Sequence, residues 1–276
     1  MIRLFTSCYP EQNPKRIAEL SQSLERNLAL PAFNKVYVFL EGMETAWVNG
    51  LKLNCQSIPH RPTYADFFGL ANEQVTSDDD LSIVANSDIF FDWSLLVLAN
   101  RLKPTQCAAL SRWDVQPDGT STLFDRNDSQ DAWIFKGKIR PVVADFCVGI
   151  PRCDNRILYE LLRAGYEVIN PAFSVKAFHL HAGERAEYPG QIEGMNVEPP
   201  YAYLWPHNLM SWPATLIQRF LHPDRRLGWR IDWRKLQRSL PWRAVNKLMK
   251  LGSGSRERGS KGQWDDEHGP DDGHAA

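Results

Sequence analysis

LSIVANSDIFFD, residues 81–92, changes from apolar to polar and acidic within a few positions. The run Leu81–Ala85 is short and almost entirely apolar, which is typical of a strand buried in a parallel sheet. It stops at Asn86-Ser87-Asp88, so we expect these polar groups at the carboxyl end of the strand, where open α/β sheets bind ligands. Asp88, with Asp92 four residues later, is suited to hold a hard divalent cation against a phosphate. Alternatively, Asp88 caps a helix that starts near Phe90, and Asp92 lies in a turn.

Size and composition limit the classes of protein to which the chain can belong. Its 276 residues can form one large domain or two small ones, and the net charge of -1 gives no global footprint for binding nucleic acid. The five cysteines are odd in number and scattered, which indicates reduced thiols in a cytosolic protein. The first residues enter a strand-like pattern at once, without the charged and apolar regions of a signal peptide. No run approaches the length of a membrane span, so any membrane contact is expected to be peripheral.

Apolar periodicity predicts alternating strands and helices along the first two thirds of the chain. Strands are expected at residues 2–6, 36–41, 51–58, 81–85, 107–114, 129–137, 166–171 and 175–180. Helices are expected at residues 14–31, 64–75, 95–102 and 157–165. This order favours an α/β fold with a mixed, mainly parallel sheet flanked by helices.

Several polar residues follow strands of this sheet and are candidates for ligand contact. The loop after the first strand begins near Ser7, and such a first loop often touches the ligand in α/β folds. Arg61 and Thr63 precede a helix, where unpaired backbone donors can meet a phosphate. The alternative for this pair is a solvated loop in which Thr63 caps the helix.

Further acidic and histidine residues lie in the second half of this region. Asp125, Asp128 and Asp131 bracket a polar loop, and two of them are expected only to form turns. His179 and His181 are two residues apart in an expected strand, so their side chains point to opposite faces. We therefore expect one of them to contact a metal while the other packs.

The composition changes near residue 201, and this gives three predicted regions: a main domain at 1–200, a basic Trp-rich helical extension at 201–251 and a disordered tail at 252–276. In the extension, tryptophans such as Trp205 and Trp229 are interleaved with arginines and lysines. Residues 205–250 can lie on an anionic membrane surface. The alternative is an amphipathic extension that packs on the main domain with a solvated basic face.

With these segments placed, the order of motifs resembles that of GT-A nucleotide-sugar glycosyltransferases over roughly Ile2 to His181. Asn86-Ser87-Asp88 is similar to the family's DXD-type metal motif, in a degenerate form because Asn86 replaces the first acidic residue. Cys153-Asp154-Asn155-Arg156, followed by a Leu-rich helix, is similar to the family's Glu-Asp motif. His179 or His181 lies where many members place a histidine near the metal and diphosphate.

This resemblance implies a GT-A-like fold and a metal-dependent sugar transfer from a nucleotide-sugar donor to a glycan, lipid-linked or other hydroxyl acceptor. Asp88 would contact Mn²⁺ or Mg²⁺, and Asp154 would be the general base for the acceptor hydroxyl. We further expect Asp131 to orient the acceptor or the donor sugar.

The remaining expected roles concern the nucleotide and its phosphates. Base and ribose would be taken by the loop residues Thr6, Ser7 and Tyr9, with Tyr9 as a stacking surface. Asn86 and Ser87 would accompany Asp88 at the phosphates. Arg61 could support the phosphates, and Arg112 or Arg126 could approach the diphosphate or the acceptor.

Two other classes of function remain open on the sequence. A nucleotidyltransferase shares an α/β sheet with an acidic strand end, but it ordinarily has a Gly-rich phosphate loop after the first strand, and residues 7–10 contain no glycine. A non-catalytic glycan-binding or membrane-recruiting module is the second alternative, and Asn86 modestly favours it. The donor sugar, the nucleotide and the acceptor depend on pocket side chains that the sequence does not position.

Overall fold

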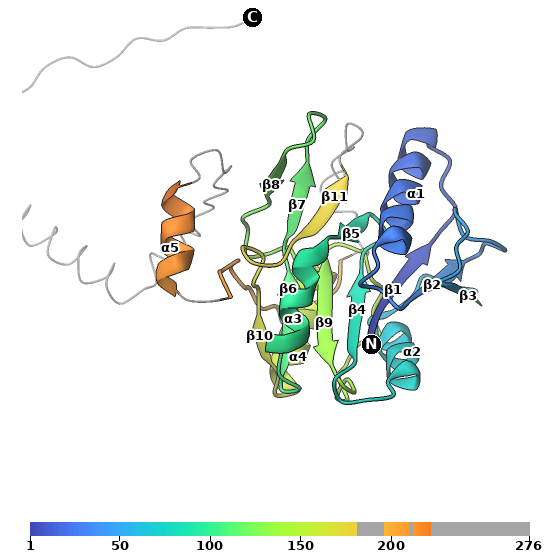
Figure 1. The fold of residues 1–276 in the computed structure, drawn as a ribbon. Helices are drawn as coiled ribbons and strands as arrows, with labels where there is room; N and C mark the ends of the chain where they lie inside the picture. Colours follow the sequence, from blue (N-terminus) through green and yellow to red (C-terminus); the bar gives the residue numbers. More distant parts are fainter. Residues whose placement is uncertain (181–195, 210–211, 222–276) are drawn as a thin grey trace, which may run out of the picture. The chain divides into compact units, whose positions relative to one another are not determined.

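A computed structural model describes residues 1–180, 196–209 and 212–221 of the chain. In these residues, a seven-stranded sheet has the strand order β10-β6-β9-β4-β1-β2-β3 (Figure 1). Its strands are β1 (Ile2–Cys8), β2 (Lys35–Glu41), β3 (Leu53–Ile58), β4 (Leu81–Ala85), β6 (Gln106–Leu110), β9 (Ala132–Lys136) and β10 (Glu167–Ile169). The pairs that involve β9 are antiparallel and the other pairs are parallel. The predicted mixed, mainly parallel sheet is therefore confirmed.

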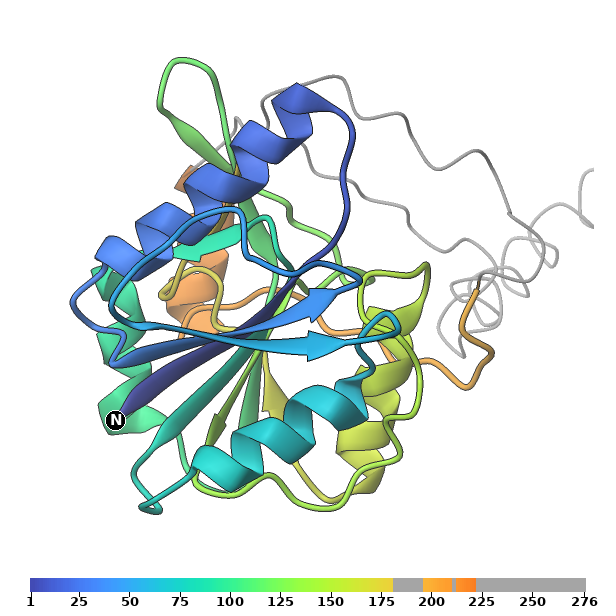
Figure 2. The same cartoon turned by 90° about the vertical axis from the view of Figure 1, so that its right-hand side faces the viewer.

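Helices cover both faces of this sheet (Figure 2). One face carries α1 (Pro14–Ala29) and α3 (Leu96–Arg101), and the other carries α2 (Tyr64–Gln74) and α4 (Cys153–Arg163). All five residues of β4 are buried, because the strand lies inside the sheet with a helix layer on each side. Its neighbouring residues Ile83 and Val84 point into two different apolar clusters, one on each face. The continuous apolar pattern of this strand follows from that double burial.

The start of helix α2 decides between the two readings of Thr63. Its hydroxyl accepts a hydrogen bond from the Asp66 amide at 3.1 Å, and the Asp66 carboxylate accepts one from the Thr63 amide at 2.8 Å. This reciprocal pair is a capping box. Thr63 is therefore a helix cap, as the alternative in the sequence analysis expected.

A second, four-stranded sheet stands beyond the carboxyl edge of the first, with the order β5-β11-β7-β8 (Figure 1). It consists of β5 (Ile89–Phe91), β11 (Ala177–Leu180), β7 (Arg112–Val115) and β8 (Ser121–Leu123). The predicted single strand at 107–114 is wrong, because the chain leaves the first sheet at Ser111. There the Ser111 side chain donates to the Ser129 carbonyl at 2.9 Å, and its amide donates to the Asn170 side chain.

The connection after Asp88 also differs from one expectation. Residues Ile89–Phe91 form a strand, so the alternative of a helix that starts near Phe90 is wrong. Asp92 instead caps the short 3-10 helix η1 (Trp93–Leu95), since its carboxylate accepts a hydrogen bond from the Ser94 amide at 2.9 Å. Asp92 thus has a local structural role and Asp88 does not cap a helix.

The predicted C-terminal extension lies largely outside the described residues, and the predicted tail lies entirely outside them. Within the extension, the structure describes a helix, α5 (Trp212–Leu221). Contacts along the chain divide it into residues 1–228 and 229–276, and the second unit belongs to the part that is not described. The domain limits at 200 and 251 therefore stay predictions. Among the described helices, none is long and apolar enough to cross a membrane.

Candidate functional site

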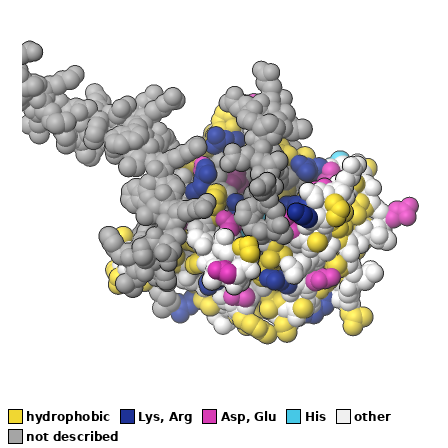
Figure 3. Space-filling model, turned by 90° about the horizontal axis from the view of Figure 1, so that it is seen from above, with side chains coloured by type: hydrophobic (Ala, Val, Ile, Leu, Met, Phe, Trp, Pro, Cys, Tyr) yellow, Lys and Arg dark blue, Asp and Glu magenta, His cyan; other side chains and the backbone are white. Residues whose placement is uncertain are grey.

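The carboxyl edge of the large sheet brings the ends of β1 and β4 together. Ser87 donates a hydrogen bond through Oγ to the Ser7 carbonyl at 2.7 Å, and the two hydroxyl oxygens lie 3.2 Å apart. The β1 strand extends to Cys8, so the first loop starts at Tyr9 and not at Ser7. On this upper face, Lys and Arg side chains lie beside Asp and Glu side chains (Figure 3). The visible part of this face thus carries both signs of charge, with hydrophobic side chains among them.

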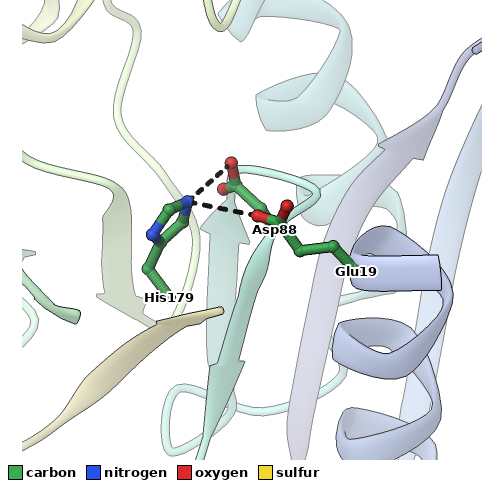
Figure 4. A group of neighbouring side chains, drawn as sticks. All are labelled: Glu19, Asp88 and His179. Atoms are coloured by element: carbon green, nitrogen blue, oxygen red, sulfur yellow. Dashed lines mark ion pairs between the residues drawn. The ribbon is translucent and has the colours of Figure 1, made fainter. Parts of the chain in front are cut away.

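Asp88 lies at the centre of a buried cluster of side chains from three parts of the chain. Glu19 comes from α1, Asp88 follows β4, and His179 comes from β11, and the three side chains point toward one another (Figure 4). Nε2 of His179 lies 3.3 Å from Oδ2 of Asp88 and 3.6 Å from Oε1 of Glu19. One ligand atom from each residue lies within 4.8 Å of the others. Two carboxylates and an imidazole in this arrangement can hold a divalent metal ion.

Arg16 adds a positive charge to this cluster. Its Nη2 atom lies 2.7 Å from Oδ2 of Asp88, and its Nη1 atom also bonds to the Glu19 carboxylate. Burial acts to raise the pKa of Asp88, but the interactions with His179 and Arg16 outweigh it and hold that pKa well below its usual range. Asp88 is therefore ionised at neutral pH.

His179 is held from both sides by carboxylates. Its Nδ1 atom lies 3.2 Å from Oδ1 of Asp114, while Nε2 faces Asp88. Burial disfavours the charged imidazole, but the two carboxylates outweigh this effect and raise the pKa of His179 to about 9. The orientation of the imidazole is thus fixed by its second carboxylate, as is common for metal-binding histidines.

A second acidic group, Asp131, lies beside Asn86, the first residue of the Asn86-Ser87-Asp88 motif. Asn86 donates through its side-chain amide to Oδ1 of Asp131 at 3.1 Å, and its backbone amide donates to the Asp131 carbonyl at 3.1 Å. Arg112 reaches the same carboxylate at 3.3 Å and also pairs with Asp114 at 2.9 Å. A continuous chain of charged side chains therefore joins the Asp88 cluster to Asp131.

Asp154 lies in the first turn of α4, near this second group. Its Oδ1 atom accepts a hydrogen bond from the Asn155 amide at 2.9 Å, and Oδ2 accepts one from the Gln130 amide at 3.3 Å. Burial, together with the negative charge of Asp131, raises the pKa of Asp154 to about 7. The side chain is still partly exposed. A carboxylate with these properties can take a proton near neutral pH.

Of the other residues expected at the nucleotide, Tyr9 lies next to Arg16 of the Asp88 cluster. Tyr9 packs edge-to-face against Trp47, with ring centroids 5.5 Å apart. Thr6 is buried within β1, so its side chain is not on the surface of the edge. Arg61 is 42% exposed and lies 3.8 Å from Glu41.

Two other expected residues are not part of the Asp88 cluster as described. Arg126 pairs with Asp128 at 2.6 Å, and this pair belongs to the polar loop before β9. His181 lies outside the described residues, so its expected metal contact stays a prediction.

Three residues of the cluster are absent from the expected site: Arg16, Glu19 and Asp114. Arg16 and Glu19 are three residues apart and face one side of α1, the helix that follows the first loop at the carboxyl edge. Asp114 is two residues after Arg112, so both side chains lie on the same face of β7. Spacing of this kind was the available signal, but charged residues at such positions are also common on solvated surfaces.

Comparisons with known proteins add little to this geometry. No family model and no curated protein matches the chain. The S. aureus protein TarS in complex with UDP-GlcNAc is 11% identical, with a TM-score of 0.36, over 66% of this chain and 56% of TarS. The Francisella tularensis cytidylyltransferase IspD is 14% identical, with a TM-score of 0.33, over 49% of this chain and 72% of IspD. Similarities at these scores assign no function to this chain.

Proposed function

We propose that the protein is a metal-dependent glycosyltransferase that uses a nucleotide-sugar donor. The observation that carries this proposal is the placement of two groups at one edge of the sheet: the buried Asp88 cluster and Asp154, whose pKa is raised to about 7. The first group suits a cation that faces phosphates, and the second suits a base for a hydroxyl. These two roles are the ones that the resemblance to the GT-A family implies for the motifs that contain Asp88 and Asp154.

Asp88 and His179 would hold the divalent cation, Mn²⁺ or Mg²⁺. The donor set supports this assignment, because oxygen and imidazole ligands converge within reach of one ion and the second nitrogen of His179 is held by Asp114. A bound cation would supply charge neutralisation for a diphosphate leaving group. Asn86 contributes no charge to it, which agrees with a motif that depends on Asp88.

Asp154 would accept the proton of the acceptor hydroxyl. The two backbone amides that bond to its carboxylate fix the side chain at the start of α4. Asp131 is positioned by Asn86 and Arg112 and would orient the acceptor or the donor sugar. Arg112 would therefore act through these carboxylates and not as a freely mobile phosphate ligand.

The nucleotide would lie on the side of the edge formed by β1, β2 and β3. Tyr9 and Ser7 are at the end of β1, and Arg61 follows β3. A shallow cavity of about 320 Å³ lies at the carboxyl ends of β2 and β3, within the usual size range of small-molecule sites. Its lining includes Leu40, Gly42, Met43, Ser57, Ile58 and Pro59. The acceptor would be a glycan or a lipid-linked molecule, and a peripheral membrane contact through residues 205–250 remains part of this proposal.

The Asp154→Asn variant tests the proposal. We expect it to lose transfer to the acceptor while it retains binding of the nucleoside diphosphate, measured by calorimetry. Asp145→Asn is a matched control, because Asp145 is exposed and lies in the loop before the same helix. Loss of nucleotide binding together with transfer would instead indicate that Asp154 only stabilises α4. Release of pyrophosphate from a nucleoside triphosphate would indicate a nucleotidyltransferase.

A further inference from the structure

Helix α1 contributes two charged side chains to the buried cluster at Asp88. Arg16 is 24% exposed, and its guanidinium bonds to the carboxylates of Asp88 and Glu19. Glu19 is only 8% exposed, although it belongs to a helix that has a solvated face. A buried glutamate costs free energy unless a cation compensates it. Arg16 supplies such a cation in this structure, and a bound divalent ion would be another.

The carboxylate of Glu19 lies where it can bind a metal ion together with Asp88 and His179. Its Oε1 atom lies 3.6 Å from Nε2 of His179, and both residues face Asp88 (Figure 4). A divalent ion binds carboxylate oxygen and imidazole nitrogen at about 2.0–2.4 Å, so small side-chain rotations, with release of the Nε2 proton of His179 to solvent, would bring all three onto one ion. Three protein ligands leave further coordination positions of the ion open. Catalytic metal sites need such open positions, whereas protein ligands fill all positions of structural sites.

Arg16 and a divalent ion compete for the same carboxylate oxygens. Oδ2 of Asp88 is 2.7 Å from the guanidinium, and the same oxygen is 3.3 Å from Nε2 of His179. A cation placed between Asp88 and Glu19 would lie a few ångströms from the guanidinium, where two positive charges repel strongly in a buried site. Arg16 is also the most exposed of these four residues, so a rotation of its long side chain would carry the guanidinium from the two carboxylates toward solvent.

We propose that Glu19 is a third protein ligand of the divalent cation at Asp88 and His179, and that Arg16 is a built-in counter-ion which the cation displaces. This proposal deepens the proposed function, on which it rests for the role of the cation. The chain thereby keeps its buried carboxylates neutralised before the metal binds. The metal site then has two states, one closed by Arg16 and one loaded with the cation.

Binding of Mn²⁺ to the full chain without nucleotide tests this proposal, with free Mn²⁺ measured by electron paramagnetic resonance. We expect Glu19→Gln to weaken binding about tenfold or more, as loss of a ligand contact does. Arg16→Gln is expected to tighten binding by about tenfold, because charge-assisted hydrogen bonds no longer compete with the metal. Glu25→Gln and Lys15→Gln are matched controls, since both residues are exposed on the same helix. These controls should leave the affinity unchanged.

Any one of three results would overturn the proposal. The first is that the wild-type chain does not bind Mn²⁺. The others are a Mn²⁺ affinity of Glu19→Gln equal to that of the wild type, or weaker Mn²⁺ binding by Arg16→Gln. Glu19→Asp provides a second variant if Glu19→Gln does not fold, because it keeps the charge and withdraws the carboxylate by one methylene. It should fold, as judged by circular dichroism, and bind Mn²⁺ more weakly than the wild type. Failure of sugar transfer alone, with these Mn²⁺ affinities as expected, would reject the proposed function and leave the metal site intact.

Discussion

Nη1 of Arg112 lies 3.3 Å from Oδ1 of Asp131, so an arginine of the small sheet pairs with a carboxylate at the edge of the large one. The same guanidinium pairs with Asp114, which holds His179. Arg112 therefore couples the region of the expected base to the region of the expected metal. Its side chain is only 11% exposed, so this coupling takes place largely out of water.

Replacement of Arg112 by glutamine should destabilise the fold by about 3 kcal/mol, because the buried Asp131 and the half-buried Asp114 lose their shared cation. Urea unfolding at neutral pH measures this change in the free energy of unfolding. Arg126→Gln is the control, since Arg126 is 36% exposed and its pair with Asp128 should contribute less than about 1 kcal/mol. Equal effects of the two substitutions would show that Arg112 does not hold the site together.

The rate of sugar transfer should depend on the protonation of Asp154. Burial and the charge of Asp131 raise its pKa to about 7, so the carboxyl is protonated and inactive as a base below that pH. We expect the rate under donor saturation to rise with pH through about 7 and then to level off. A flat rate profile from about pH 5 to about pH 8 would contradict the role of Asp154 as base.

Ionisation of Asp154 should also lower the free energy of unfolding at higher pH. An acid whose pKa is higher in the folded state holds its proton more tightly there, so the wild-type free energy of unfolding falls as pH rises from about 4 to about 7. Asp154→Asn lacks this loss, so its stability relative to the wild type should rise by up to about 4 kcal/mol over the same interval. Chemical unfolding at both ends of the interval measures the difference. A stability difference that does not change with pH would exclude a raised pKa.

Substitutions of Thr63 and Arg61 should have different effects on stability and on ligand binding. Thr63 caps helix α2, whereas Arg61 is exposed. Thr63→Ala removes the capping hydroxyl and should destabilise the protein by about 1 kcal/mol without weakening nucleoside diphosphate binding. Arg61→Gln should leave the free energy of unfolding within about 0.5 kcal/mol and weaken nucleoside diphosphate binding. Thermal unfolding and calorimetry report the two quantities. A loss of binding by Thr63→Ala at unchanged stability would assign the phosphate contact to Thr63 instead.

The sequence predicts most of the large sheet because its strands are buried on both faces. Continuous apolar runs such as β4 and β2 stand out from amphipathic helices such as α1. The small sheet was harder to predict, since β5 has three residues and β7 follows β6 with only Ser111 between them. Apolar periodicity cannot detect a change of sheet within one run of residues.

The candidate site was predictable where polar residues directly follow a strand or begin a helix. Asp88 follows the parallel strand β4, and Asp154 lies in the first turn of α4. Asp131 directly precedes β9, whose antiparallel direction places the start of that strand at the same edge. Their roles at a site stay predictions. Arg16 and Glu19 were not expected, since charged residues three apart on a helix usually lie on a solvated face. Only the packing of α1 beside β5 turns these two side chains toward Asp88.

The most direct test of the proposed function is the release of nucleoside diphosphate from a panel of nucleotide sugars in the presence of Mn²⁺. We expect at least one donor to yield nucleoside diphosphate with the wild-type chain, and this release to be lost in Asp88→Asn. Absence of nucleoside diphosphate with every donor, with and without acceptors, would contradict the assignment of a glycosyltransferase.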